Sequence, residues 1–195
     1  MRAFVALELP PEAVGQIERI LGTLKGPVSA AAASKTKIRW VRPSQAHLTL
    51  RFLGEVTPKQ VEAIIDNLEK DLLPRHSTLQ LGFGRGGAFP SLAKARVLWV
   101  ALEGSTERLL EIAGIAEAAA QRGGVEPSTR QFRPHVTLAR IQPPINVTSP
   151  LRSLRGNRDM WPGRVVSLIR SDLTKKGPEY TRLAQFDLEA GRMIE

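Results

Sequence analysis

Two short strings each occur twice along this chain, in the same order, and this repetition restricts the possible folds more than any other feature. Val-Ala-Leu-Glu occupies residues 5–8 and again 100–103, and His-Leu-Thr-Leu at 47–50 is matched by His-Val-Thr-Leu at 135–138. In both copies a strand pattern is followed by a helix pattern and then by the strand that carries the histidine. This order predicts a duplicated half-domain with pseudo-two-fold symmetry.

The order of the expected elements favours an α+β fold. A doubly wound parallel sheet would also alternate strands and helices, but the second half ends in consecutive strands with the pattern of a hairpin around Gly177. A length of 195 residues suits one compact domain or two small lobes with a shared core. We therefore expect one two-lobed domain over residues 1–195, built from related halves at about 1–90 and 91–195. The expected strands are 2–9, 38–41, 46–53, 77–83, 96–102, 131–141, 164–173 and 179–188.

Proline, glycine and capping residues mark the expected helix boundaries. The first helix begins at Pro11 and ends at Gly26, which leaves residues 27–37 as a small, basic loop. Thr57 precedes a proline and is followed three residues later by a glutamine, so a capping box is expected to begin a helix over 58–73. A third helix is expected from Ser105 to the glycine pair at 123–124.

Two further segments are expected to be irregular. Residues 82–87 satisfy G-x-G-x-x-G, but Pro90 and another strand follow where a dinucleotide site needs a helix, so we expect a turn here. Residues 142–163 are rich in proline and glycine and are expected to form a long excursion. Trp99 stands in an apolar strand and is expected in the core.

Composition narrows the classes of partner and compartment. Lys and Arg number 28 against 19 Asp and Glu, a net charge of +9, which favours an anionic partner. The absence of cysteine excludes a disulfide scaffold, a thiolate metal site and a cysteine nucleophile. No signal-peptide pattern and no membrane-length apolar run is found, so we expect a cytoplasmic protein without a membrane partner.

The repeated His-x-Thr element is the strongest indication of chemistry. Residues two apart on a strand share a face, so His47 with Thr49, and His135 with Thr137, each place one imidazole beside one hydroxyl. A lone histidine would more often be structural, but the duplication argues against that interpretation here. Two histidines across a pseudo-two-fold axis suit in-line displacement at phosphorus, in which one takes a proton from water and the other protonates the leaving oxygen. The threonine hydroxyls would hold the non-bridging phosphate oxygens. The residues alone leave open which histidine is the acid.

Arginines support a phosphate site near the second motif. Residues 130–170 hold eight arginines and one acid, Asp159. Arg140 stands fifth after its histidine, where Phe52 stands in the first copy, so one copy offers a phosphate clamp and the other an aromatic face for a base. Strict alternation puts Arg140 and Phe52 on the face opposite their histidines, so the assignment requires each strand to end or bulge at this point.

These motifs resemble a known family. The segments His47-Leu-Thr-Leu and Pro134-His135-Val-Thr-Leu-Ala-Arg140, with Phe52-Leu-Gly-Glu after the first, are similar to the two-histidine phosphoesterase superfamily, in particular to its RNA 2′,3′-cyclic phosphodiesterase branch, also called 2′-5′ RNA ligase. The resemblance implies a bilobal α+β fold, with two antiparallel-rich sheets flanking a central cleft and helices outside.

The resemblance also implies an activity. It is the opening of a terminal RNA 2′,3′-cyclic phosphate to a 2′-phosphomonoester without metal or other cofactor, with reverse 2′-5′ ligation as a second direction. His47 would be the proton donor and His135 the acceptor, while Thr49, Thr137 and Arg140 would bind phosphate. The partner expected is RNA that ends in a 2′,3′-cyclic phosphate, for which tRNA fragments are one candidate, and the chain is expected to act as a monomer. Two alternatives stay open: a non-catalytic RNA-binding module, and a cyclic phosphodiesterase of small nucleotides.

Overall fold

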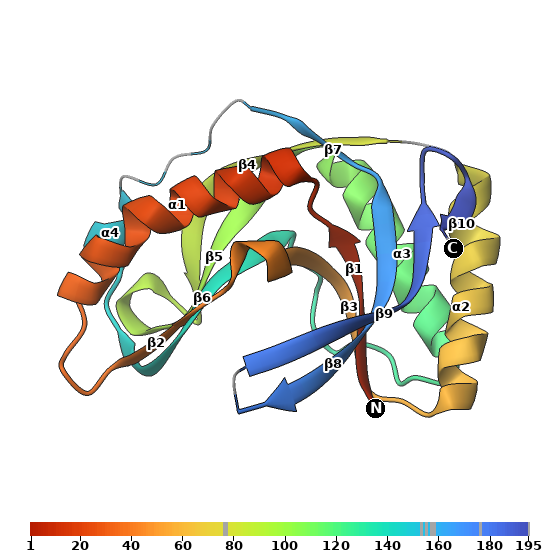
Figure 1. The fold of residues 1–195 in the computed structure, drawn as a ribbon, viewed down its shortest axis with the longest axis horizontal. Coiled ribbons are helices and arrows are strands. Elements are labelled where there is room, and N and C mark those ends of the chain that lie inside the picture. Colours follow the sequence, from red (N-terminus) through yellow and green to blue (C-terminus); the bar gives the residue numbers. More distant parts are fainter. Residues whose placement is uncertain (76–77, 153, 155, 157–158, 176, 195) are drawn as a thin grey trace.

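Two five-stranded antiparallel sheets form the framework of the computed structural model (Figure 1). The structure describes residues 1–75, 78–152, 154, 156, 159–175 and 177–194. The first sheet runs in the order β10 (Arg192–Ile194), β9 (Gly177–Asp187), β8 (Val165–Thr174), β1 (Arg2–Glu8) and β3 (His47–Glu55). The second sheet runs β2 (Lys37–Trp40), β6 (His135–Ile145), β5 (Ala95–Gly104), β4 (Leu79–Phe89) and β7 (Trp161–Gly163). The expected α+β class is confirmed, and each sheet combines strands from both halves of the chain.

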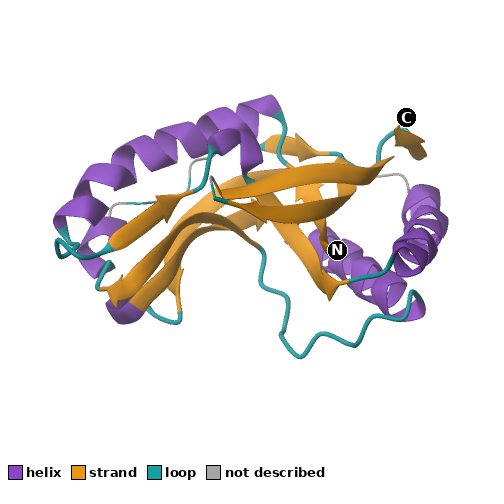
Figure 2. Ribbon diagram, turned by 60° about the horizontal axis from the view of Figure 1, so that its bottom comes forward, coloured by secondary structure: helices purple, strands orange, loops and turns teal. Residues whose placement is uncertain are grey.

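The three long helices pack against the sheets, and the core lies between helices and sheets. α1 (Pro11–Ala30) runs along the second sheet, whereas α2 (Pro58–Leu72) and α3 (Thr106–Arg122) pack together beside the first sheet (Figures 1 and 2). Among the described residues there are also four short helices: η1 (Pro43–Gln45), η2 (Leu73–Arg75), η3 (Leu92–Lys94) and α4 (Thr148–Arg152). None of the helices in the described ranges combines the length and apolar composition needed to cross a lipid bilayer.

The two histidine strands are fixed by their apolar residues. Leu48 on β3 and Val136 on β6 are fully buried, and both belong to one continuous core with residues of α1, α2 and α3. Because side chains alternate along a strand, the histidine and threonine of each motif lie on the opposite face, away from the helices. The packing of the core therefore decides that His47 and His135 face away from it.

α2 begins with the expected capping box. The Thr57 hydroxyl accepts a hydrogen bond from the Gln60 backbone, and the Gln60 side chain accepts one from the Thr57 backbone N–H at 3.0 Å. Buried Val61, Ile64 and Leu68 follow at helical spacing. This helix ends at Leu72, one residue before the expected end.

The expected end of the first helix at Gly26 was wrong. α1 continues through Pro27 to Ala30, and Val28 is fully buried. Val28 extends the apolar stripe of Leu21 and Leu24, so burial outweighs the local cost of glycine and proline. The loop expected at 27–37 is therefore shorter than predicted, because α1 ends at Ala30 and β2 begins at Lys37.

The glycine-rich segment is a strand and not the expected turn. Residues 82–87 lie inside β4, where Gly87 is paired with Trp99. A Cβ atom at Gly87 would overlap the Trp99 ring, so glycine makes room for an aromatic side chain on the neighbouring strand. The excursion at 142–163 also contains regular structure, because it includes the end of β6, α4 and β7 with fully buried Trp161.

Truncation of the core residue next to the first histidine tests this account of the framework. We expect Leu48→Ala to lower the free energy of unfolding by about 2–5 kcal/mol, because it leaves a cavity at a fully buried position. Leu110→Ala is the matched control at a half-exposed position of α3, with an expected change within about 0.5 kcal/mol. Urea unfolding followed by circular dichroism measures both, and equal losses would contradict the assignment of Leu48 to the core.

Candidate active site

Each histidine strand carries one extra residue at the same place in its motif. Along β3, Ala6 is paired with Thr49 and Val5 with Arg51, so Leu50 is extra, and along β6 Leu138 is extra between Thr137 and Ala139. Such a β-bulge puts two successive side chains on one face. Alternation then resumes, and the next residue of each strand returns to the face of the histidine.

The bulges bring the fifth residue of each motif to the site. Phe52 is paired with Phe4, and the Phe4 ring also stacks on His47, with ring centroids 4.7 Å apart. Arg140 is paired with Val97, and its charge acts on both His47 and His135. The structure thus places the six predicted site residues on the facing surfaces of β3 and β6: His47, Thr49, Phe52, His135, Thr137 and Arg140. We refer to these six residues as the histidine site.

The two imidazoles are held by the same local hydrogen bond. Nδ1 of His47 lies 2.9 Å from the carbonyl oxygen of Gln45, and Nδ1 of His135 lies 2.6 Å from that of Arg133. A carbonyl oxygen only accepts, so Nδ1 of each ring carries the hydrogen. Nε2 of each ring is left to exchange protons with a bound molecule.

Aromatic side chains fix the planes of the two rings. His47 stacks on Phe4 and meets the edge of Tyr180 at a centroid distance of 5.4 Å. His135 meets Phe89 at 5.2 Å and Trp99 at 6.2 Å, in both cases edge to face. Trp99 was expected in the core, but it lies on the site face because Gly87 gives it room there.

Burial and charge lower the pKa of both histidines below the ordinary value of 6.5. Removal from water is the main cause for each ring, because it disfavours the imidazolium form, and the Arg140 guanidinium adds to the lowering. The bonds to the Gln45 and Arg133 carbonyls act in the opposite direction. The neutral form of each ring is therefore favoured over the imidazolium, and its Nε2 is a proton acceptor.

A partly buried carboxylate, that of Glu8, distinguishes the surroundings of the two histidines. Glu8 is paired directly with His47 across β1 and β3, and its charge raises the pKa of that histidine. At the corresponding place beside His135 stands Ala101. The two copies of the motif are thus alike in sequence but differ in electrostatic environment.

Four hydrogen bonds hold the Glu8 carboxylate in place. Arg182 donates to both oxygens, at 2.7 and 2.8 Å, and Ser167 and Gln185 donate to Oε1 at 2.6 and 3.0 Å. Burial would raise the pKa of Glu8, but these bonds and the Arg182 charge together lower it. Glu8 is therefore ionised at neutral pH and supplies a fixed negative charge next to His47.

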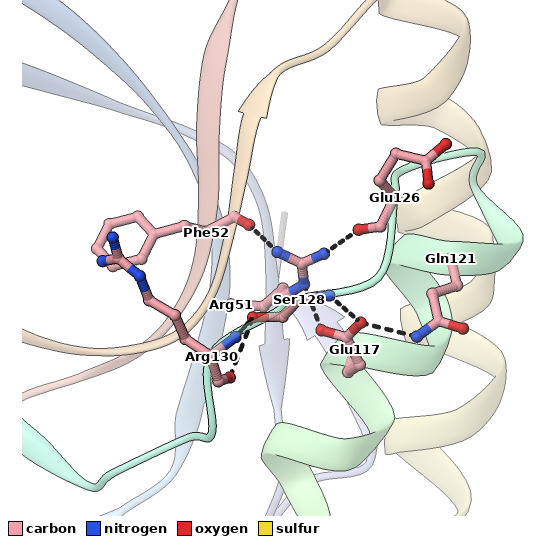
Figure 3. Close-up of polar contacts among 7 residues, drawn as sticks. All are labelled: Arg51, Phe52, Glu117, Gln121, Glu126, Ser128 and Arg130. Carbon is pink, nitrogen blue, oxygen red and sulfur yellow. Dashed lines mark hydrogen bonds and ion pairs between the residues drawn. The ribbon is translucent and has the colours of Figure 1, made fainter.

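Arg51 joins the strand of the first motif to residues that precede the second motif in the sequence (Figure 3). Its guanidinium donates to the carbonyl oxygens of Phe52 and Glu126 and forms an ion pair with Glu117 of α3. Glu117 also accepts a hydrogen bond from the Ser128 backbone at 2.9 Å. The segment that leads from α3 to His135 is in this way tied to the strand of His47.

Phe52 is an exposed member of the histidine site, with 62 % of its surface open to solvent. It lines a cavity of about 470 Å³ together with Gly54, Gln60 and Val125. An exposed ring beside open space can stack on a planar group without displacing core side chains.

Sequence reasoning missed the residues that support the histidines from other strands. The rings of Phe4, Tyr180 and Trp99 contact the two imidazoles. The Glu8 carboxylate acts on His47, where its negative charge favours the imidazolium form. Among these, only Glu8 had a usable signal, because an acid ends the first copy of the repeated Val-Ala-Leu-Glu string. Of the arginines between 130 and 170, the structure brings Arg140 to both histidines, while Arg155 and Arg158 lie outside the described residues. No group of three or more histidine, aspartate or glutamate side chains in the described ranges is placed to hold a metal ion.

Comparison with known proteins gives consistent matches over the chain. The family model of the LigT-like phosphoesterases matches residues 7–99, which include the first motif. The RNA 2′,3′-cyclic phosphodiesterase of Thermus thermophilus is 35% identical over 210 aligned positions, which cover 98% of this chain and 93% of the relative. The enzyme of the same name from Aquifex aeolicus is 32% identical, with 77% of this chain and 81% of the relative covered.

The fold leads to the same relatives. The crystal structure of Escherichia coli LigT in its apo form superposes with a TM-score of 0.76 at 25% identity, over 95% of this chain and 96% of LigT. The Thermus and Aquifex alignments extend the match beyond the region of the family model, over most of the chain. On this evidence, which includes relatives from Thermus and Aquifex named RNA 2′,3′-cyclic phosphodiesterase, the chain belongs to the LigT-like phosphoesterase family.

Proposed function

We propose that this protein hydrolyses terminal 2′,3′-cyclic phosphodiesters of RNA to 2′-phosphomonoesters by acid–base catalysis with two histidines. The observation that carries the proposal is the pair of Nδ1–carbonyl hydrogen bonds, which leave Nε2 of both rings available on the same site, beside Arg140. Family membership supports the class of reaction, since the curated relatives carry the name of this activity. Proton transfer by the two rings uses only side chains of this chain.

The reaction proceeds by in-line attack of water on the cyclic phosphorus. His135 takes a proton from the water as its oxygen bonds to phosphorus, and the bond from phosphorus to O3′ breaks. His47 protonates O3′, which leaves the phosphate on O2′. Arg140 balances the negative charge on the non-bridging oxygens, and the hydroxyls of Thr49 and Thr137 donate hydrogen bonds to them. The exposed Phe52 ring is available to stack on the terminal base. The same steps with the 5′-hydroxyl of a second RNA strand in place of water form a 2′–5′ phosphodiester and release O3′ as a hydroxyl, which is the ligation direction.

Glu8 supports the assignment of His47 as the acid. A general acid must be protonated when the substrate binds, and a carboxylate beside it favours the imidazolium form. His135 has Ala101 in place of this carboxylate, so its neutral form is favoured, as a general base requires. Glu8 is a positioning residue in this scheme, because it acts through His47.

Substitution of either histidine tests the proposed chemistry. We expect His47→Ala and His135→Ala each to lower kcat by about 100- to 10,000-fold on an RNA oligonucleotide that ends in a 2′,3′-cyclic phosphate. The assay contains excess EDTA and identifies the product by its terminal phosphate, and circular dichroism checks that each variant is folded. Near-wild-type turnover of either variant would refute the role of that histidine. A 3′-phosphate product would refute the proposed leaving oxygen, and tight RNA binding without turnover would favour a binding module.

Glu8→Gln tests which histidine is the acid. Loss of the carboxylate lowers the pKa of His47, because the imidazolium loses its anionic neighbour. At a pH above both histidine pKa values, the active fraction follows the pKa of the acid, whereas below both it follows the pKa of the base. With His47 as acid, Glu8→Gln should therefore lower kcat/KM in the alkaline limb and leave the acidic limb unchanged.

The controls for this experiment separate electrostatics from folding. Glu62→Gln makes the same change at an exposed position of α2 and should leave the whole pH profile unchanged. Titration of the ring protons by NMR should show a lower pKa for His47 and an unchanged one for His135. A gain of activity in the acidic limb would instead identify His47 as the base.

A further inference from the structure

A row of cationic side chains extends from the histidine site along the edge of the second sheet. β2 is the edge strand, and its neighbour is β6, which carries His135. Arg39 of β2 is paired directly with Arg140 of β6, and Lys37 is paired with Gln142. Directly paired residues of an antiparallel sheet have Cβ atoms about 4.5–5.5 Å apart.

The register places this row on the same face as the histidine site. Ile38 and Trp40 pack against the core, so Lys37 and Arg39, which alternate with them, point to the opposite face. Arg140 lies on that face too, since its charge acts on both histidines. Lys37, Arg39 and Arg140 are all exposed, and we call these three residues the cationic row.

Within the part of the chain that the structure describes, the cationic row has no acidic partners that would explain it as a structural feature. Like charges directly opposite each other destabilise a sheet. Across the described ranges, no ion pair involves Lys37, Arg39 or Arg140. Other arginines of the chain are paired, for example Arg51 with Glu117 and Arg182 with Glu8. An anion bound beside Arg39 and Arg140 would offset the repulsion between them, because both guanidinium groups would be attracted to it.

We propose that Lys37 and Arg39 bind backbone phosphates of the RNA on the 5′ side of the reacting end. This inference rests on the proposed function, in which Arg140 holds the terminal cyclic phosphate. A 2′,3′-cyclic phosphate terminates the 3′ end, so every other phosphate of the strand lies on its 5′ side. The strand would leave the histidine site along β2, where the cationic row continues, and the protein would prefer an oligonucleotide to a mononucleotide.

Substrate length provides the test. We compare kcat/KM for a mononucleotide 2′,3′-cyclic phosphate and for a short RNA oligonucleotide with the same end. The double variant Lys37→Gln/Arg39→Gln should lose roughly tenfold in kcat/KM on the oligonucleotide and leave mononucleotide turnover unchanged. It should also reduce the salt dependence of log kcat/KM on the oligonucleotide by a slope of about 1.4, for two lost contacts to a single strand.

A matched control removes the same charges elsewhere. Arg19 on α1 and Lys70 on α2 are exposed, and Arg19→Gln/Lys70→Gln should leave both substrates unaffected. An equal loss in this control, or an equal loss on both substrates in the Lys37/Arg39 variant, would overturn the inference.

Binding separates this inference from the proposed function. Fluorescence anisotropy with a labelled oligonucleotide that ends in a 2′-phosphate measures the cationic row without any turnover. Weaker binding by the Lys37→Gln/Arg39→Gln variant, with the control unchanged, supports the row even if the wild-type protein turns over neither cyclic substrate. Failure of wild-type turnover refutes the proposed function alone, whereas unchanged binding refutes the cationic row.

Discussion

One extra residue in each histidine strand determines which side chains meet at the site. Leu50 and Leu138 each add a second core-facing position, so the strand after them is shifted in phase. Without the shift, Arg140 would point among buried leucines and isoleucines, where an unpaired guanidinium is very unfavourable. The bulges therefore allow one strand to anchor itself in the core and still present a histidine, a threonine and a fifth side chain to the same ligand.

The two motifs are alike in sequence, but a difference in strand register makes their surroundings electrostatically unequal. Leu7 and Glu8 lie opposite Leu48 and His47, whereas in the second copy Val100 and Ala101 take these places. The repeated Val-Ala-Leu-Glu strings are thus displaced by two residues relative to their histidine strands. A displacement of two preserves the faces of a strand. It moves the second glutamate, Glu103, beyond its histidine, where it is paired with Gly82.

The features that depend on residues close together in the sequence were predicted correctly. The α+β class, the capping box at Thr57 and the common face of His47 and Thr49 follow from periodicity and end signals. The extension of α1 past Gly26 could not be predicted in this way, because it depends on a buried site for Val28 that other elements create. The contact of Arg182 with Glu8 was equally inaccessible, since Arg182 lies 174 residues further along the chain. Alternation along the strands required each histidine strand either to end or to bulge before the fifth residue of its motif. The pairing with β1 and with β5 shows that both strands bulge.

The mixing of strands from both ends of the chain has a consequence for biosynthesis. β1 leaves the ribosome before the other strands of its sheet, and in the finished sheet it lies between β3 and β8. β8 begins at Val165, so the edge of β1 that pairs with it stays unpaired until the intervening segment, which includes β3 and the strands of the second sheet, has been translated. Closure of such distant pairings is slow compared with local helix formation. A nascent chain thus exposes one edge of the apolar β1 while this intervening segment is made, and the interval before β8 arrives is when β1 is most open to pairing with other chains.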